Sequence, residues 1–362
     1  MKKVNVNLGY HQYDIIIDKN LNSRIIRFIN GHTNHNKVLF LLDRNFYSQQ
    51  KIAIDQIIDG VNNSFRLMIN ASEKNKTYSS VIKIHEFMQR KKFGRDSLLV
   101  AVGGGITGDI GGFAASIYMR GIPYIQIPTT LLAAVDSSVG GKTGINLNTA
   151  KNFIGSFYQP EAVFIDVNFF NTLPFEERLC GLGEILKYGF LTEKRIFNYL
   201  KKNGSKILDL DSTAIKKIVA ESVKYKSSVV IADERESGIR KLLNLGHTFA
   251  HAFEMNSKHK IKHGHAVIIG LVAAVRLAKN LELVSEKNYM EFLSLLLPYS
   301  EYIKLKNAGS RAVYKSMFSD KKTRGGKLKF VLPVEIGKIL IDVEADKKGV
   351  LDAIQFSLEY FS

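Results

Sequence analysis

The hydrophobic positions in the first half of the chain form short apolar runs, separated by stretches with helical spacing. Apolar runs of this length are typical of buried strands in a parallel sheet. In the stretch 78–92, Val81, Ile84 and Met88 recur near helical spacing. Such alternation of strand and helix predicts a largely parallel, doubly wound sheet. The predicted strands are 37–42, 64–69, 97–102, 124–127 and 162–165.

The pattern changes after Pro174. From there on the apolar residues mostly keep helical spacing, most clearly over 214–231 and 266–283. We therefore predict an α/β fold followed by an α fold. Residues 1–174 would form a Rossmann-like domain with a parallel sheet, and 175–362 a mainly helical domain.

Size and composition are those of a soluble two-domain protein, with 362 residues, 45% hydrophobic and 23% charged. Cys180 is the one cysteine, so no internal disulfide forms and a reducing compartment fits best. The N-terminus lacks the apolar core of a signal peptide, and no stretch approaches the ~20 apolar residues of a membrane span. We expect a cytoplasmic protein with no membrane partner.

The net charge of +17 raises nucleic acid as a partner. However, the lysines are dispersed, and no basic run interleaves with aromatic residues as a single-strand groove requires. We attribute most of the charge to composition and a smaller share to anionic small ligands. No nucleic-acid partner is predicted.

A glycine-rich turn follows the predicted strand that ends before Gly103. Glycines let the backbone approach a pyrophosphate, and the next helix offers free N–H groups. Gly103, Gly105 and Gly108 satisfy the dinucleotide fingerprint, although such turns also serve tight strand–helix packing. No acid lies ~20 residues later to bind a ribose. Asp43, after an earlier predicted strand, is a candidate for that role, and its alternative is a helix N-cap.

A second candidate for phosphate binding is Lys142, which follows Gly140 and Gly141. The segment imitates the end of a P-loop, but the first glycine of that motif is missing, which argues against a nucleoside triphosphatase. A lysine beside two glycines still suits a phosphate group. Lys151 and Asn152 add a cation and an amide nearby.

Metal-ligating residue types gather in the second half. His247 and His251 lie four apart, on one face of a predicted helix. Glu184 and His263 complete a donor set that suits a divalent metal of the zinc type. Helix spacing alone would take both His247 and His251 as ligands, and buried, hydrogen-bonded helix histidines are the alternative.

Taken together, these segments resemble the 3-dehydroquinate synthase family of sugar-phosphate cyclases, over nearly the whole chain. The resemblance implies an NAD-binding α/β domain, a helical metal domain and a homodimer. The motifs that carry it are GGGITGDIGGFAAS, YMRGIPYIQIPTTLLAAVDSSVGGKTGIN, KNFIGSFYQP, GLGEILKYG, LNLGHTFAHAFE and HGHAVIIG.

The resemblance also assigns residues. It places a divalent metal, zinc or cobalt, on Glu184, His247 and His263, which leaves His251 to substrate or protons and overrules the helix-spacing interpretation. Its NAD-binding positions fall on Asp43, Glu73, Lys76, Gly105, Ile106, Thr107, Gly108, Asp109, Thr129, Thr130, Lys142, Lys151, Phe169, Phe170, Asn171 and Thr172. Its substrate positions fall on Asp136, Lys142, Asn152, Arg240, Asn244 and Lys321, with Arg120 donated across a dimer interface, and its catalytic positions on Lys187, His251, Lys226 and Glu236.

The implied activity is that of a phosphorus–oxygen lyase in aromatic amino-acid biosynthesis. It converts 3-deoxy-D-arabino-heptulosonate 7-phosphate to 3-dehydroquinate and phosphate, through transient oxidation by NAD, phosphate elimination, re-reduction and aldol closure. Two alternatives remain: another sugar-phosphate cyclase, and a metal-dependent polyol-phosphate dehydrogenase of the same build.

This chain departs from the family pattern at several positions. His265 stands where the family usually has an acid, and we expect it to compete for the metal or to alter the surroundings of the ligands. Gly183 replaces the usual alanine before Glu184, and we expect it to loosen the helix locally. Ala71-Ser72 also differs from the commoner turn before Glu73.

Overall fold

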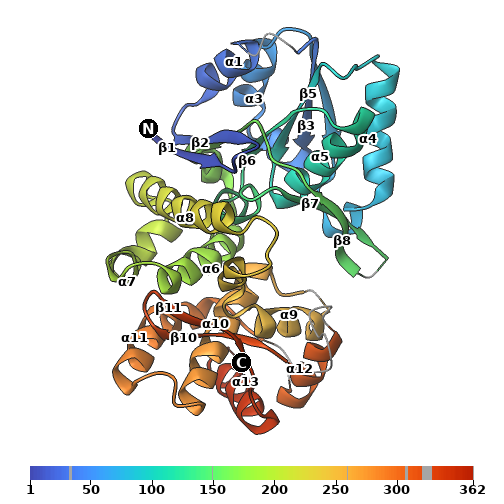
Figure 1. Cartoon of the computed structure of the whole chain (residues 1–362). Helices are drawn as coiled ribbons and strands as arrows, with labels where there is room; N and C mark the ends of the chain where they lie inside the picture. Colours follow the sequence, from blue (N-terminus) through green and yellow to red (C-terminus); the bar gives the residue numbers. More distant parts are fainter. Residues whose placement is uncertain (32–34, 149, 259, 306–308, 320–327, 362) are drawn as a thin grey trace. The chain divides into compact units, whose positions relative to one another are not determined.

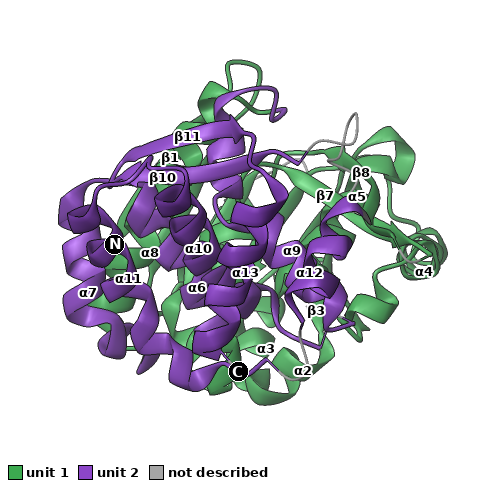
Figure 2. Ribbon diagram, turned by 90° about the horizontal axis from the view of Figure 1, so that it is seen from below, with its two compact units in different colours: residues 1–177, 210–234 green, residues 178–209, 235–362 purple. Residues whose placement is uncertain are grey.

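The chain folds into two compact units in the computed structural model (Figure 1). The structure describes residues 1–31, 35–148, 150–258, 260–305, 309–319 and 328–361. Unit 1 contains residues 1–177 and 210–234, and unit 2 contains residues 178–209 and 235–362 (Figure 2).

Unit 1 is built on a seven-stranded sheet with the order β1-β2-β9-β6-β5-β3-β4. Neighbouring strands are parallel except β1 and β2, which pair antiparallel at one edge. All five strands predicted from apolar runs are present, and the doubly wound parallel sheet is confirmed. The strands are β1 (Lys2–Asn7), β2 (Gln12–Asp18), β3 (Lys37–Asp43), β4 (Ser64–Ile69), β5 (Ser97–Gly103), β6 (Tyr124–Pro128) and β9 (Ala162–Asp166).

Helices cover both faces of this sheet. Because successive side chains of a strand point to opposite faces, Phe40 packs in one hydrophobic cluster and Leu41 in the other. The strand order reverses between β3 and β5, so the carboxyl ends of these strands form a switch point, where ligands bind in such sheets. One face carries α1 (Asn22–Gly31), α2 (Arg44–Gln49) and α3 (Lys51–Asp59), and the other carries α4 (Tyr78–Arg90) and α5 (Gly105–Ile117).

Two further parts of unit 1 lie outside the seven-stranded sheet. One is a hairpin of β7 (Lys142–Leu147) and β8 (Ala150–Phe157). The other is α8 (Ser212–Ala232), which contacts β1 and β2. The predicted domain limits, 1–174 and 175–362, stay a prediction, and the compact units differ from them by placing α8 with the first part of the chain.

Unit 2 is mainly helical, as predicted. Its centre is α10, whose residues from Gly264 to Val275 are buried on every side, and α10 contacts α9, α11 and α13. Within the described ranges, no helix is both long and apolar enough to span a membrane. The elements are α6 (Phe175–Leu191), α7 (Lys194–Leu208), α9 (His247–Asn256), α10 (His263–Asn280), α11 (Glu286–Leu296), α12 (Ser310–Ser316), α13 (Lys347–Phe361), β10 (Phe330–Glu335) and β11 (Lys338–Val343).

Phe292 of α11 tests the packing of unit 2. Its ring is fully buried and stacks on Phe190, with centroids 4.5 Å apart and planes 11° apart. We expect Phe292→Ala to lower the free energy of unfolding by about 3–5 kcal/mol, since it leaves a cavity. Urea unfolding followed by circular dichroism measures this, and Met290→Ala, at a side chain that is 57% exposed, should change stability by at most ~0.5 kcal/mol. Equal effects of the two variants would contradict the packing account.

Candidate functional site

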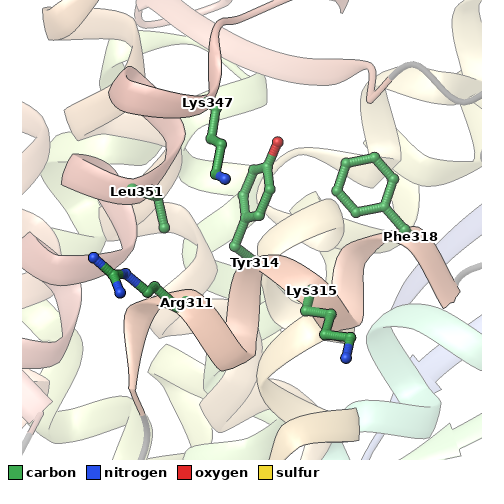
Figure 3. Close-up of a pocket in the computed structure, with 6 residues that line it drawn as sticks. All are labelled: Arg311, Tyr314, Lys315, Phe318, Lys347 and Leu351. Carbon is green, nitrogen blue, oxygen red and sulfur yellow. The ribbon is translucent and has the colours of Figure 1, made fainter.

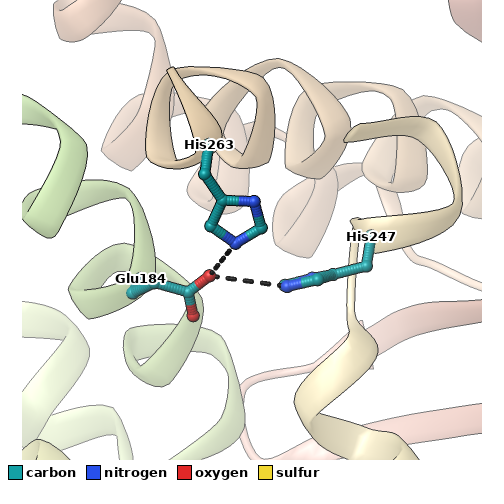
Figure 4. A group of neighbouring side chains, drawn as sticks. All are labelled: Glu184, His247 and His263. Atoms are coloured by element: carbon teal, nitrogen blue, oxygen red, sulfur yellow. Dashed lines mark hydrogen bonds and ion pairs between the residues drawn. The ribbon is translucent and has the colours of Figure 1, made fainter. Parts of the chain in front are cut away.

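Glu184, His247 and His263 converge in unit 2, as Figure 4 shows. Glu184 lies in the middle of α6, and the two histidines are the first residues of α9 and α10. The Nε2 atoms of His263 and His247 lie 3.2 and 3.4 Å from Glu184 Oε1. All three ligand atoms lie within 4.8 Å of one another. One carboxylate and two imidazoles at this spacing fit a divalent metal of the zinc type that keeps a coordination position open.

Further contacts orient both histidines. The His247 ring places Nδ1 3.1 Å from the Leu245 carbonyl oxygen, and the His263 ring places Nδ1 3.5 Å from Glu254 Oε1. Each Nε2 is thereby directed at Glu184, which is the arrangement that metal-ligating histidines commonly need. Glu254 was not among the sequence candidates. Its signal was position, since it follows His247 by seven residues and so lies on the same face of α9.

The charges around Glu184 favour the ligating forms of Glu184 and His247. Burial alone would lower the pKa of His263, but its hydrogen bonds to Glu184 and Glu254 raise that pKa to about 10, so a metal that binds there must displace a proton. Burial alone would raise the pKa of the Glu184 carboxyl, but the ion pair with Lys187 and hydrogen bonds from both histidines hold that pKa well below its usual range. Burial, together with the Lys187 ammonium, lowers the pKa of His247 to about 4. An anionic Glu184 and a neutral His247 are the protonation states that bind a metal.

His251 and His265 lie outside this converging set within the part of the chain that the structure describes. The His251 ring is one turn further along α9, with its centroid 5.6 Å from that of His247 and 6.4 Å from that of His263. His265 is buried, but it follows His263 by two residues and so points to a different side of α10. The geometry favours the ligand set implied by the family resemblance over the pair indicated by helix spacing.

A close crossing of α6 and α10 brings Glu184 and His263 together. A Cβ atom on Gly264 would overlap the carbonyl oxygen of Cys180, and one on Gly183 would overlap the carbonyl oxygen of Gly264. The Gly264 N–H also points at Cys180 Sγ, 3.3 Å away. Gly183 was expected to loosen α6, but the helix is continuous there and the glycine allows the close approach.

In unit 1, the predicted glycine-rich turn lies at the switch point of the sheet. Gly104 is the N-cap of α5, and because it is a glycine no side chain caps the N–H groups at the start of this helix. A Cβ atom on Gly103 would overlap Thr107 Oγ1 and lie 3.0 Å from the Cβ of Asp43. Thr107 Oγ1 is buried and has no hydrogen-bond partner among the described residues. The pyrophosphate of a dinucleotide fits this turn for three reasons. The backbone is bare, a 13-residue helix starts there, and the Thr107 hydroxyl is buried and unpaired among the described residues.

Asp43 lies beside this turn and also caps α2. Its Oδ1 accepts a hydrogen bond from the Asn45 N–H at 3.0 Å, so the N-cap alternative is realised. Burial raises the pKa of its carboxyl. A carboxylate has about four acceptor positions, so the cap leaves capacity for a ribose hydroxyl.

The other predicted cofactor positions differ in their surroundings. The Thr129 N–H donates to the Gly103 carbonyl oxygen at 2.9 Å, which joins the ends of β6 and β5. Phe169 and Phe170 are buried, and Phe169 packs edge-on against Phe46 in the core. Within this predicted segment, Asn171 is exposed and remains available to a ligand.

The predicted substrate residues of unit 1 include one partly buried ion pair. Lys226 of α8 donates to the Asp136 carboxylate at 2.5 Å and to its carbonyl oxygen at 2.6 Å. Asp136 belongs to η3 (Ala133–Ser137), a π-helical turn of the kind that is frequent at functional sites. Lys142 and Asn152 are exposed on the β7–β8 hairpin, and Arg120 is exposed in a left-handed conformation with φ +73°.

In unit 2, the predicted residues Glu236, Arg240 and Asn244 lie in or near η5 (Ile239–Asn244). Arg240 is buried, and Asn244 Nδ2 donates to Glu236 Oε1 at 2.6 Å. Lys321 lies outside the described residues. A separate hollow of about 310 Å³ between α12 and α13 contains none of the predicted residues (Figure 3). Its lining is Arg311, Tyr314, Lys315, Phe318, Lys347 and Leu351.

Gly264→Ala tests the helix crossing. The new methyl group cannot coexist with the Cys180 carbonyl oxygen, so α10 must move away from α6 and carry His263 with it. We expect Co²⁺ affinity, measured by absorbance titration of metal-free protein, to fall about 10- to 100-fold. Gly189→Ala is the matched control in α6, because its methyl group would meet the ends of the Leu200 and Leu295 side chains rather than main-chain atoms. Unchanged Co²⁺ affinity in the Gly264 variant would contradict the crossing account.

Comparison with known proteins agrees with the family resemblance over most of the chain. The family models for the 3-dehydroquinate synthase N-terminal and C-terminal domains match residues 66–179 and 181–323. A 3-dehydroquinate synthase of Pelagibacter ubique is 40% identical, over 96% of each chain.

Solved structures of two other synthases share the fold. A 2-deoxy-scyllo-inosose synthase complexed with carbaglucose-6-phosphate, NAD⁺ and Co²⁺ superposes with a TM-score of 0.87 at 23% identity, covering 98% of this chain and 100% of that one. A 2-epi-5-epi-valiolone synthase of Streptomyces hygroscopicus with NAD⁺ and Zn²⁺ gives 0.85 at 24%, covering 96% and 97%. The family models and the identity to the Pelagibacter enzyme show that this chain belongs to the 3-dehydroquinate synthase family.

Proposed function

We propose that this chain converts 3-deoxy-D-arabino-heptulosonate 7-phosphate to 3-dehydroquinate and phosphate, as a phosphorus–oxygen lyase that depends on NAD and a divalent metal. The observation that carries the proposal is the convergence of Glu184, His247 and His263 in a member of this family. The bare glycine turn at the switch point of the sheet supports the NAD dependence.

Glu184, His247 and His263 would hold the metal, and the turn from Gly103 to Thr107 would hold the pyrophosphate of NAD. When bound, NAD supplies a hydride acceptor that is regenerated within the turnover, and zinc or cobalt supplies a Lewis acid for a substrate oxygen. The ion pair of Lys187 with Glu184 keeps that carboxylate anionic, so it remains a ligand.

The chain's own residues account for the remaining requirements of a substrate with a carboxylate and a phosphate. A guanidinium fork suits a planar carboxylate, which favours Arg240 for that role. Lys142 and Asn152, exposed on the β7–β8 hairpin, suit the phosphate. His251 is the candidate for moving protons, because its ring lies close to the predicted metal ligands without joining them.

The same proposal includes a cytoplasmic homodimer in which Arg120 reaches the partner's substrate site. Its support within this chain is the exposure of Arg120 and its left-handed backbone, which holds the residue at a sharp turn before Gly121.

Phosphate release from the seven-carbon substrate is the decisive assay. We expect release that requires NAD, without accumulation of NADH absorbance, because the hydride returns to the substrate. A polyol-phosphate dehydrogenase would instead accumulate NADH with no phosphate release. A different sugar-phosphate cyclase would leave the seven-carbon substrate intact and consume another sugar phosphate, which a substrate panel identifies.

Chelation tests the metal. We expect a chelator to abolish phosphate release and Zn²⁺ or Co²⁺ to restore it. His263→Ala should lose high-affinity metal binding, whereas His251→Ala should keep it and lose turnover, since His251 lies outside the ligand set. Full activity of metal-free protein, or loss of metal from the His251 variant alone, would contradict this assignment.

A further inference from the structure

The β7–β8 hairpin is irregular at Asn146. Ile145 pairs with Ile154 and Leu147 with Ala150, so the register shifts and Asn146 faces extra residues of β8. Among them, Asn152 adopts a left-handed conformation with φ +48°. Bulges of this kind re-aim side chains and are over-represented next to active sites.

The side chain of Asn146 closes the gap in the ladder. Asn146 Oδ1 accepts a hydrogen bond from the Asn152 N–H at 2.8 Å. This bond helps to hold the backbone of Asn152 in the left-handed conformation, which asparagine adopts more readily than most residues with a side chain. Asn146 therefore holds the position of a residue that we propose for substrate phosphate.

The same side chain reaches the turn η1 (Glu73–Asn75). Asn146 Nδ2 donates to Glu73 Oε1 at 2.8 Å, and its backbone N–H donates to the Lys76 carbonyl oxygen at 2.7 Å. Glu73 and Lys76 are both predicted to contact NAD. One half-buried amide thus bonds a cofactor segment on one side and a phosphate segment on the other.

Lys76 closes the network from the opposite direction. Its buried ammonium donates to Asn152 Oδ1 and to Asp109 Oδ2, each at 2.5 Å. Asp109 lies in the first turns of α5, directly after the glycine-rich turn. Asn152 is consequently held by its backbone through Asn146 and by its side chain through Lys76.

We propose that Asn146 is a positioning residue that couples NAD binding to phosphate binding, by holding the β7–β8 hairpin against the turn that carries Glu73 and Lys76. The inference rests on the proposed function, because that function gives the two segments their ligands. Either ligand restrains the shared network, so the second one binds to residues that are already ordered. By reciprocity, each ligand raises the affinity for the other by the same factor.

Calorimetry of NAD⁺ binding, with and without saturating inorganic phosphate, measures this factor in the full-length protein. We expect phosphate to tighten NAD⁺ binding about fivefold or more in the unaltered chain. Asn146→Ala should reduce the factor to about one, because the side-chain hydrogen bonds to Glu73 and Asn152 are lost. In turnover, it should lower kcat/KM for the substrate more than kcat.

Two variants make the test specific. Asn146→Asp keeps the oxygen that accepts from the Asn152 N–H but places a carboxylate against the Glu73 carboxylate. Phosphate affinity should therefore persist while the coupling is lost. This variant also tests the coupling if Asn146→Ala does not fold. Leu147→Ala, at the neighbouring exposed residue, should keep the full factor. Coupling that is unchanged in both Asn146 variants, or absent from the unaltered chain, overturns the inference.

Turnover separates this inference from the proposed function. If the unaltered chain releases phosphate from the seven-carbon substrate but shows no coupling between NAD and phosphate binding, only the role proposed for Asn146 is contradicted. If coupling depends on Asn146 and no phosphate is released from that substrate, the proposed function falls and the coupling stands.

Discussion

The backbone crossing of α6 and α10 is the constraint on which the candidate metal centre depends. Glycine at 183 and at 264 lets two helices approach until main-chain atoms touch, and each glycine is next to a ligand in sequence. Any side chain at 264 would separate the helices. The distance between Glu184 and His263 is therefore set by an absence of side chains, whereas the Leu245 carbonyl and Glu254 set the directions of the two histidine rings.

In unit 1, a missing side chain at a glycine leaves space for a ligand. At Gly103 the missing side chain leaves backbone exposed between Thr107 and Asp43, at the switch point of the parallel sheet. There the space is left for a ligand rather than filled by a second helix. The candidate metal centre and the glycine-rich turn thus both depend on glycines that no hydrophobic pattern explains. In both, an ionisable or hydroxyl group lies beside the bare backbone.

Much of the fold could be predicted because apolar runs report burial directly. The five parallel strands and the long helices α4, α8 and α10 follow from period and length alone. Neither the β7–β8 hairpin nor the place of α8 followed in this way. No residue of β8 is buried, which weakens the apolar pattern of the hairpin. Periodicity reveals that α8 has an apolar face, without revealing which strands cover it.

The candidate site could be predicted only as far as residue types and family motifs reach. Helix spacing singled out His251 as the partner of His247, because spacing measures neighbours on one helix. The observed donors come from three helices, and the direction of each side chain is set by tertiary contacts such as Glu254 with His263. Asn146 escaped notice for the same reason, since an asparagine in a hairpin is an ordinary turn residue until its two partners are seen. Residues that orient ligands are hard to predict from sequence, because their role depends on the residues that they contact in the folded chain.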